Sequence, residues 1–73
     1  MIDTLKIGDV LLDNDPRQEG RTIVVEAIAH RVGKRVQYAV YQAGVRRAYI
    51  RFDRIFADGK KRRFGWTLLP GGG

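Results

Sequence analysis

The apolar residues of this chain recur with a period of two, and short turn segments separate the stretches that carry them. Residues 35–41 and 47–52 show the alternation most clearly. No window holds apolar residues at helical spacing for three turns, so the pattern predicts half-buried β-strands throughout. The side chains expected to face the core are Val36, Tyr38 and Val40 in the first stretch and Ala48, Ile50 and Phe52 in the second.

Five strands are predicted in a chain of 73 residues, which has room for one domain. The expected strands cover residues 10–12, 22–28, 35–41, 47–52 and 64–69. Turn signals lie between them at Gly33-Lys34, Ala43-Gly44 and Asp58-Gly59. Several short strands without a helix favour an all-β fold, and the expected architecture is a small five-stranded SH3-like barrel over residues 1–70. A short helical turn over 53–55 would precede the last strand, and the glycines at 71–73 would form a flexible tail.

The register of the central hairpins follows from keeping apolar residues on one face. A loop of Ala43-Gly44 alone would place Val40 opposite Arg47. A loop of residues 43–45 instead places Val40 opposite Ala48, and we expect that register. In the preceding hairpin, a two-residue loop at 33–34 pairs residue 27 with 40 and residue 29 with 38. The outer face would then carry three rows, of residues 26, 41 and 47, of residues 28, 39 and 49, and of residues 30, 37 and 51.

Charge divides the chain unevenly. Residues 1–30 carry three Lys/Arg against six Asp/Glu, whereas residues 31–73 carry eleven Lys/Arg against two Asp/Glu. Ten of the fourteen basic residues are arginine, which binds phosphate or carboxylate with two hydrogen bonds and stacks on flat rings. This distribution indicates a surface for an anionic partner.

Two candidate binding groups emerge. The first is an arginine–tyrosine face of the sheet, where arginines would contact phosphates and tyrosines would offer flat surfaces for bases. Its residues are Arg35, Tyr41, Arg46, Arg47, Tyr49 and Arg51. The second is a basic loop of four consecutive cations, Lys60, Lys61, Arg62 and Arg63. Both patterns also suit an ordinary solvated surface. Trp66 is expected in the core, on the same side of the last strand as Phe64 and Leu68.

The remaining polar groups argue against catalysis and metal binding. Asp13-Asn14-Asp15 alternates acids, but Arg17 occupies the next ligand position of a calcium loop. We expect Asp13 or Asp15 to accept hydrogen bonds from Arg17 or Arg21. His30 is expected to be an exposed residue near the Gly33 turn, with no nucleophile or acid beside it. The chain has no cysteine. We therefore expect neither enzyme activity nor a cofactor.

Residues 7–56 contain a set of short motifs, Gly8-Asp9-Val10, the run from Asp13 to Arg17, Gly20-Arg21-Thr22 and the run from Ile50 to Arg54. Together these motifs resemble a family of small basic proteins of bacteria and their phages. Gly8-Asp9 is also similar to the first strand of ribosomal and transcription-factor barrels of the KOW type, which commonly bind RNA or protein. The chain departs from that type after residue 20, so the resemblance implies the fold and transfers no binding residue.

The leading functional hypothesis is a nucleic-acid-binding module of low sequence specificity, for DNA or RNA. The alternative is a phage- or bacteria-encoded adaptor or inhibitor that docks on an acidic host protein through the row of residues 28, 39 and 49 and the acidic loop. Both hypotheses allow a monomer or a homodimer. The absence of cysteine, of a charged apolar leader and of a membrane-length segment favours a cytoplasmic protein that does not enter membranes.

Overall fold

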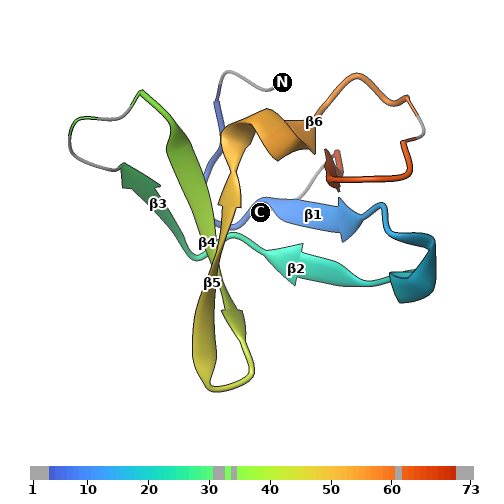
Figure 1. Cartoon of the computed structure of the whole chain (residues 1–73), viewed down its shortest axis with the longest axis horizontal. Coiled ribbons are helices and arrows are strands. Elements are labelled where there is room, and N and C mark those ends of the chain that lie inside the picture. Colours follow the sequence, from blue (N-terminus) through green and yellow to red (C-terminus); the bar gives the residue numbers. More distant parts are fainter. Residues whose placement is uncertain (1–3, 31–32, 34, 61, 71–73) are drawn as a thin grey trace.

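Short strands in two sheets make up the protein (Figure 1). The structure is a computed structural model, and it describes residues 4–30, 33, 35–60 and 62–70. The first sheet has the order β2-β1-β7-β6, with β1 Val10–Asp13, β2 Thr22–Val24, β6 Ile55–Phe56 and β7 Trp66–Leu68. The second has the order β3-β4-β5, with β3 Ala27–His30, β4 Gln37–Ala43 and β5 Arg46–Arg51. Two 3₁₀-helices, η1 Pro16–Gln18 and η2 Phe52–Arg54, complete the described elements.

The strand predicted over 22–28 passes from one sheet to the other. The Val25 N–H donates to the Asp9 carbonyl at 2.8 Å, beside β1, and the next N–H, of Glu26, donates to the Val40 carbonyl of β4 at 2.8 Å. The backbone therefore changes partner between two consecutive residues, which divides the predicted strand into β2 and β3. Val25 at this crossing is fully buried, so the β-branched run packs where the two sheets meet.

The predicted pairing of β3 with β4 is confirmed. Ala27 pairs with Val40, and Ala29 pairs with Tyr38. The turn that the prediction placed at Gly33-Lys34 includes Lys34, which lies outside the described residues. His30 ends β3 as an exposed residue, as expected.

The predicted pairing of β4 with β5 is wrong by one residue. Ala43 pairs with Arg46 and Val40 pairs with Tyr49, so the loop is Gly44-Val45 and not residues 43–45. Gly44 has a φ of +66°, and a glycine with positive φ at the first central position is typical of a type II′ hairpin turn. Strand β4 also begins two residues later than expected, at Gln37, so Val36 precedes it.

The corrected register reverses the faces of β4. The core cluster holds Ala39 and Tyr41 from β4, facing Ile50 from β5. Tyr38 and Val40 therefore lie on the opposite, outer face, although Val40 is itself buried there. The expected inward positions of β5 are confirmed, since Ile50 and Phe52 are buried and Ala48 packs against the core. None of the three predicted outer rows exists. Tyr41, Ala39 and Ile28 lie on the core side, and Arg51 pairs with Tyr38, so it does not continue the pair of residues 30 and 37.

The last strand is shorter than predicted. Trp66 and Leu68 pack against the core as expected, and the Trp66 ring lies 5.8 Å from the Tyr41 ring between centroids. Phe64, expected on the same inward side, is 74% exposed. Gly65 has a φ of +79°, which interrupts the alternation of side chains between the two faces of a strand. The direction of the Phe64 side chain is therefore not set by β7.

The all-β class is confirmed, and η2 lies where the short helical turn was expected, starting one residue earlier at Phe52. The radius of gyration is 11.7 Å, close to the roughly 11 Å of a compact domain of this length. The described elements form two sheets, and closure of these sheets into a barrel stays a prediction. No helix in the described part of the chain has the length and apolar character needed to cross a membrane. The glycine tail 71–73 lies outside the described residues.

Candidate nucleic-acid interface

The outer face of the β4–β5 hairpin carries alternating arginine and tyrosine side chains. Because successive side chains of a strand point to opposite faces, Arg47, Tyr49 and Arg51 lie opposite the buried Ile50. The Tyr38 ring of β4 meets Tyr49 edge-on, with centroids 6.5 Å apart and planes at 87°. We call Tyr38, Arg47, Tyr49 and Arg51 the sheet face. Tyr49 is 59% exposed, which leaves much of its side chain open to a ligand.

A shallow hollow lies against the two tyrosines. It has a volume of about 410 Å³ and is lined by Ala29, His30, Tyr38 and Tyr49. Ala29 pairs directly with Tyr38 across the β3–β4 ladder, so the small side chain leaves the tyrosine ring accessible from the β3 side. The hollow therefore offers aromatic and imidazole surfaces beside the arginines of β5.

Three predicted members of the arginine–tyrosine face lie elsewhere. Tyr41 is only 8% exposed and belongs to the core, so its prediction as a binding residue is wrong. Arg46 is exposed, but it neighbours Arg47 in the strand and points to the opposite side near the hairpin tip. Arg35 is exposed and lies before β4, outside the strand. Tyr38, which the prediction placed inside, lies on the outer face, where it pairs with Arg51.

The charges of the sheet face are partly compensated. Arg51 Nη2 lies 2.7 Å from Asp53 Oδ2 and donates a hydrogen bond to it. Within the described residues, no ion pair forms at Arg47, Arg46 or Arg35. Arg47 therefore keeps its full charge for a ligand, whereas Arg51 shares its charge with a carboxylate two residues away.

The basic loop uses one of its cations internally. Both Nη atoms of Arg62 donate to the two carboxylate oxygens of Asp58 at 2.7 Å. The same guanidinium lies over the Phe56 ring, 3.9 Å from its centroid. Arg62 therefore holds the loop together through Asp58 and Phe56. Its position in a run of four cations did not predict this structural role. Lys60 and Arg63 are exposed, and Lys61 lies outside the described residues.

The pKa of Asp58 is held well below its usual range. The principal cause is the hydrogen bond from the Arg62 side chain, followed by that from the Lys60 backbone N–H. Conversely, the hydrogen bond to Asp58 raises the pKa of Arg62. Both groups are thus charged over the whole physiological pH range, and Asp58 offsets one positive charge of the loop.

A second hollow joins the basic loop to η2. It has a volume of about 400 Å³ and is lined by Arg54, Phe56, Arg62, Arg63, Phe64 and Gly65. We call these six residues the arginine pocket. Arg54 was not among the predicted site residues, because it stands alone in the sequence between Asp53 and Ile55. Its place at the end of η2 brings it beside cations eight and nine positions later in the chain.

Close backbone contacts hold the arginine pocket in shape. A Cβ added at Gly65 would meet the Arg54 carbonyl oxygen at 2.6 Å and the Phe56 ring at 2.8 Å, so only glycine permits this approach. Asn14 fixes the same segment from the other side. Its Nδ2 donates to the Phe64 carbonyl at 3.2 Å, its backbone N–H donates to the Gly65 carbonyl at 3.1 Å, and its Oδ1 accepts from the Thr67 hydroxyl at 2.8 Å.

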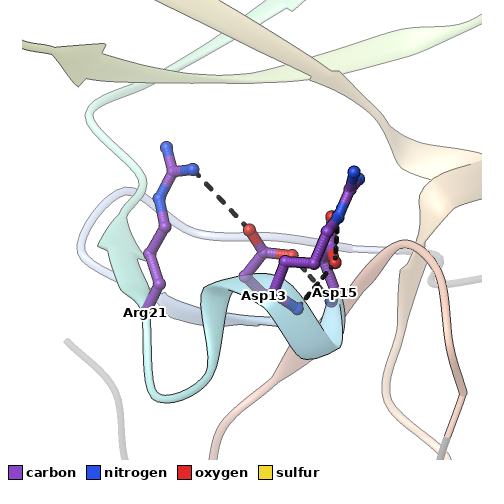
Figure 2. Close-up of polar contacts among 4 residues, drawn as sticks. Asp13, Asp15 and Arg21 are labelled. Carbon is purple, nitrogen blue, oxygen red and sulfur yellow. Dashed lines mark hydrogen bonds and ion pairs between the residues drawn. The ribbon is translucent and has the colours of Figure 1, made fainter.

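The two arginines of the N-terminal half serve structure, as predicted. Arg17 donates from Nε and Nη2 to Asp15, at 3.1 and 2.9 Å, and the Asp15 carboxylate also accepts the Arg17 N–H as the N-cap of η1. Figure 2 shows Arg21 directed at Asp13, with Nη1 to Oδ2 at 3.7 Å. Arg21 also lies 5.7 Å from the Trp66 ring centroid. The side-chain hydrogen bond from Arg17 lowers the pKa of Asp15.

Comparisons with family models, with curated proteins and with solved structures found no match to this chain. The chemistry of the sheet face and of the arginine pocket is therefore the basis for assigning a function.

Proposed function

We propose that this protein binds single-stranded nucleic acid, DNA or RNA, with low sequence specificity, and that it does so on a small SH3-like barrel. The observation that supports the proposal is the alternation of Arg47, Tyr49 and Arg51 on the outer side of β5, beside Tyr38. The strand spacing places a cation on each side of an exposed ring. A nucleotide chain has the matching arrangement, with a phosphate on each side of every base.

The two kinds of side chain would make different contributions to binding. Arginines neutralise phosphates and release counterions, which gives affinity without reading sequence. Stacking of a base on an aromatic ring contributes about 1–3 kcal/mol for each base and tolerates any base, because every base has a flat face. The sheet face has both, and it lacks a rigid set of amide donors and acceptors that would select one base.

Two features support the barrel in this proposal, namely η2 and the segment that runs from β2 through Val25 into β3. The chain passes from the first sheet to the second between Val25 and Glu26, and a 3₁₀ turn at Phe52–Arg54 precedes the strands that return to β1. A bent strand shared by two sheets is what a small barrel requires to close. The Gly8-Asp9 resemblance noted above agrees with this interpretation.

The test is a titration of a fluorescently labelled 20-nucleotide single strand, followed by anisotropy at several salt concentrations between 25 and 300 mM. If about five phosphates are contacted, log affinity falls against log salt with a slope of roughly −3.5 for a single strand. An unlabelled duplex of the same sequence should compete less well, because paired bases are not available for stacking. Absence of binding at 25 mM salt, or a slope near zero, would contradict the proposal.

A second candidate function is docking on an acidic protein, which the hairpin tip favours. Val45 is 97% exposed between Gly44 and the exposed Arg46. Arginine is enriched in protein interfaces, and the centre of an interface is more apolar than the rest of a protein surface. Affinity capture from a nuclease-treated lysate separates the two functions. Retention of one stoichiometric protein, lost on changing Val45 to Asp, would support docking, whereas loss of all partners after nuclease treatment supports nucleic-acid binding.

A further inference from the structure

We infer that the arginine pocket is a second binding site, which takes one unpaired nucleotide with its base against Phe64 and its phosphate between Arg54 and Arg63. The inference rests on the proposed function, since it assigns a further part of the same ligand to a different part of the molecule. It concerns η2 and the basic loop, whereas the proposal above concerns the sheet face.

The exposed ring of Phe64 is the first observation. It is 74% exposed although it is one of the largest apolar side chains of the protein. Its backbone, in contrast, is fixed, because its carbonyl accepts from Asn14 and the next residue, Gly65, is in close contact with η2. An aromatic side chain on a fixed backbone beside cations is the arrangement of a stacking platform.

The distribution of charge is the second observation. Of the three arginines, Arg62 is neutralised by Asp58 and stacked on Phe56, so it forms a wall of the hollow. Arg54 and Arg63 are exposed, and no ion pair forms at either within the described residues. Two charged guanidinium groups from separate segments thus border a hollow next to the Phe64 ring.

The ligand class follows from these features together. A purely apolar ligand would leave two cations uncompensated, and a simple anion would leave the ring unused. A nucleotide supplies both an anionic group for the arginines and a flat ring for Phe64. The hollow of about 400 Å³ falls in the range of roughly 300–1,000 Å³ that small-ligand sites occupy, and it is large enough for a single nucleotide unit.

The experiment compares the protein with and without the Phe64 ring, and for each it compares a ligand with bases and a ligand without them. The probes are a ten-nucleotide oligothymidylate and an abasic strand with the same number of phosphates, titrated at 25 mM salt. We expect Phe64→Ala to weaken oligothymidylate binding about tenfold and to leave binding of the abasic strand unchanged. Ile7→Ala removes a comparably exposed apolar side chain and should change neither affinity.

A second variant tests the phosphate contact. Changing Arg54 and Arg63 together to Gln should make the salt slope less steep by about 0.7, because the two arginines hold a single phosphate and each phosphate contact contributes about 0.7 for a single strand. If Phe64→Ala weakens both strands equally or neither, or if the double variant keeps the wild-type slope, the pocket is not the nucleotide site. If the wild-type chain binds neither strand at 25 mM salt, the proposed function fails as well, so the two failures are distinguishable.

Discussion

The β4–β5 hairpin and the basic loop present similar chemistry, arginines next to aromatic rings, but they hold it in different ways. The hairpin is fixed by six residue pairs of an antiparallel ladder, which sets the direction of every side chain along it. The loop between β6 and β7 is fixed, in its described residues, by isolated contacts. They are the approach of Gly65 to Arg54, the pairing of Arg62 with Asp58, and the hydrogen bonds from Asn14 to the carbonyls of residues 64 and 65. A repeated ladder tolerates the loss of a surface side chain, whereas a loop built on single contacts does not tolerate the loss of one of them.

The largest expected effect is a loss of stability, and it tests which side of the β4–β5 hairpin faces the core. Tyr41→Ala should lower the free energy of unfolding by about 3–5 kcal/mol, the usual cost of deleting a buried aromatic ring. Tyr49→Ala, on the opposite face of the neighbouring strand, should cost no more than about 1 kcal/mol, mainly the edge contact with Tyr38. Urea unfolding followed by Trp66 fluorescence measures both. Equal losses for the two variants would mean that the β4–β5 register is not the one described.

The next effect tests the loop. Gly65→Ala should lower the free energy of unfolding by roughly 2–5 kcal/mol, because a positive φ costs a side chain about 1–2 kcal/mol and overpacking adds about 1–3 kcal/mol. Gly59→Ala is the matched control, since Gly59 has a φ of +74° but no atom within 4 Å of an added Cβ. It should cost only the strain of the positive φ. The same urea titration applies, and a Gly65 variant no less stable than the Gly59 variant would show that the close approach to Arg54 is absent.

The fold class was predictable because alternation and turn residues are local signals. The β3–β4 register was also predictable, because the turn signal at residues 33–34 set the length of the loop. The face was not, since the core side of this strand pair carries Ile28 and Ala39. The β4–β5 register was not, because residues 38–41 read Tyr-Ala-Val-Tyr, with apolar side chains on both faces. For such a strand, matching apolar with apolar does not select a face. The type II′ turn at Gly44-Val45 decides the register, and the prediction did not weigh that turn.

The candidate site was predictable in composition and not in geometry. The run of cations at 60–63 is visible in the sequence, but the use of Arg62 by Asp58 and Phe56 depends on how the loop folds back. Likewise, Arg54 and Asn14 are separated from the loop in sequence and join it only through η2 and the end of β1. Charge counting therefore located the basic region and overestimated the number of arginines that a ligand can use.

A smaller effect on nucleic-acid binding is expected from removing one arginine, and it should depend on whether that arginine is ion-paired with a carboxylate. Arg47→Gln should weaken binding of a single strand several-fold and make the salt slope less steep by about 0.7, as expected for one lost phosphate contact. Arg17→Gln removes the same charge from a side chain that is bonded to Asp15, and it should leave both quantities close to wild type. Anisotropy titrations at 25–300 mM salt measure them. Equal effects of the two variants would indicate binding to net charge alone.

The smallest effect concerns the pH dependence of the loop. The pKa of Asp58 is lower in the folded protein than in the unfolded chain, because Arg62 and the Lys60 N–H bond to the carboxylate. Such a group stabilises the fold fully above its unfolded pKa of about 3.9, and this contribution is lost as the pH falls towards the lower folded pKa. The gap in Tm between wild type and Asp58→Asn should therefore be constant from pH 7 to about pH 5 and narrow below about pH 4.

Asp15→Asn provides a parallel for that measurement, because Arg17 also lowers the pKa of Asp15. The difference in Tm between the wild-type protein and each of the two Asn variants should decrease as the pH is lowered. The Arg62 Nε–Hε resonance gives a local readout that distinguishes the loop from η1, since it should shift with acid in the wild-type protein and in Asp15→Asn but not in Asp58→Asn. A wild-type resonance that shifts with a midpoint at the ordinary aspartate pKa of about 3.9, while the protein stays folded, would mean that Asp58 does not hold Arg62. Another contact would then have to keep Arg62 over Phe56. The loop would be held by fewer contacts than described, and its contrast with the ladder of the β4–β5 hairpin would have to be drawn without the Asp58–Arg62 pair.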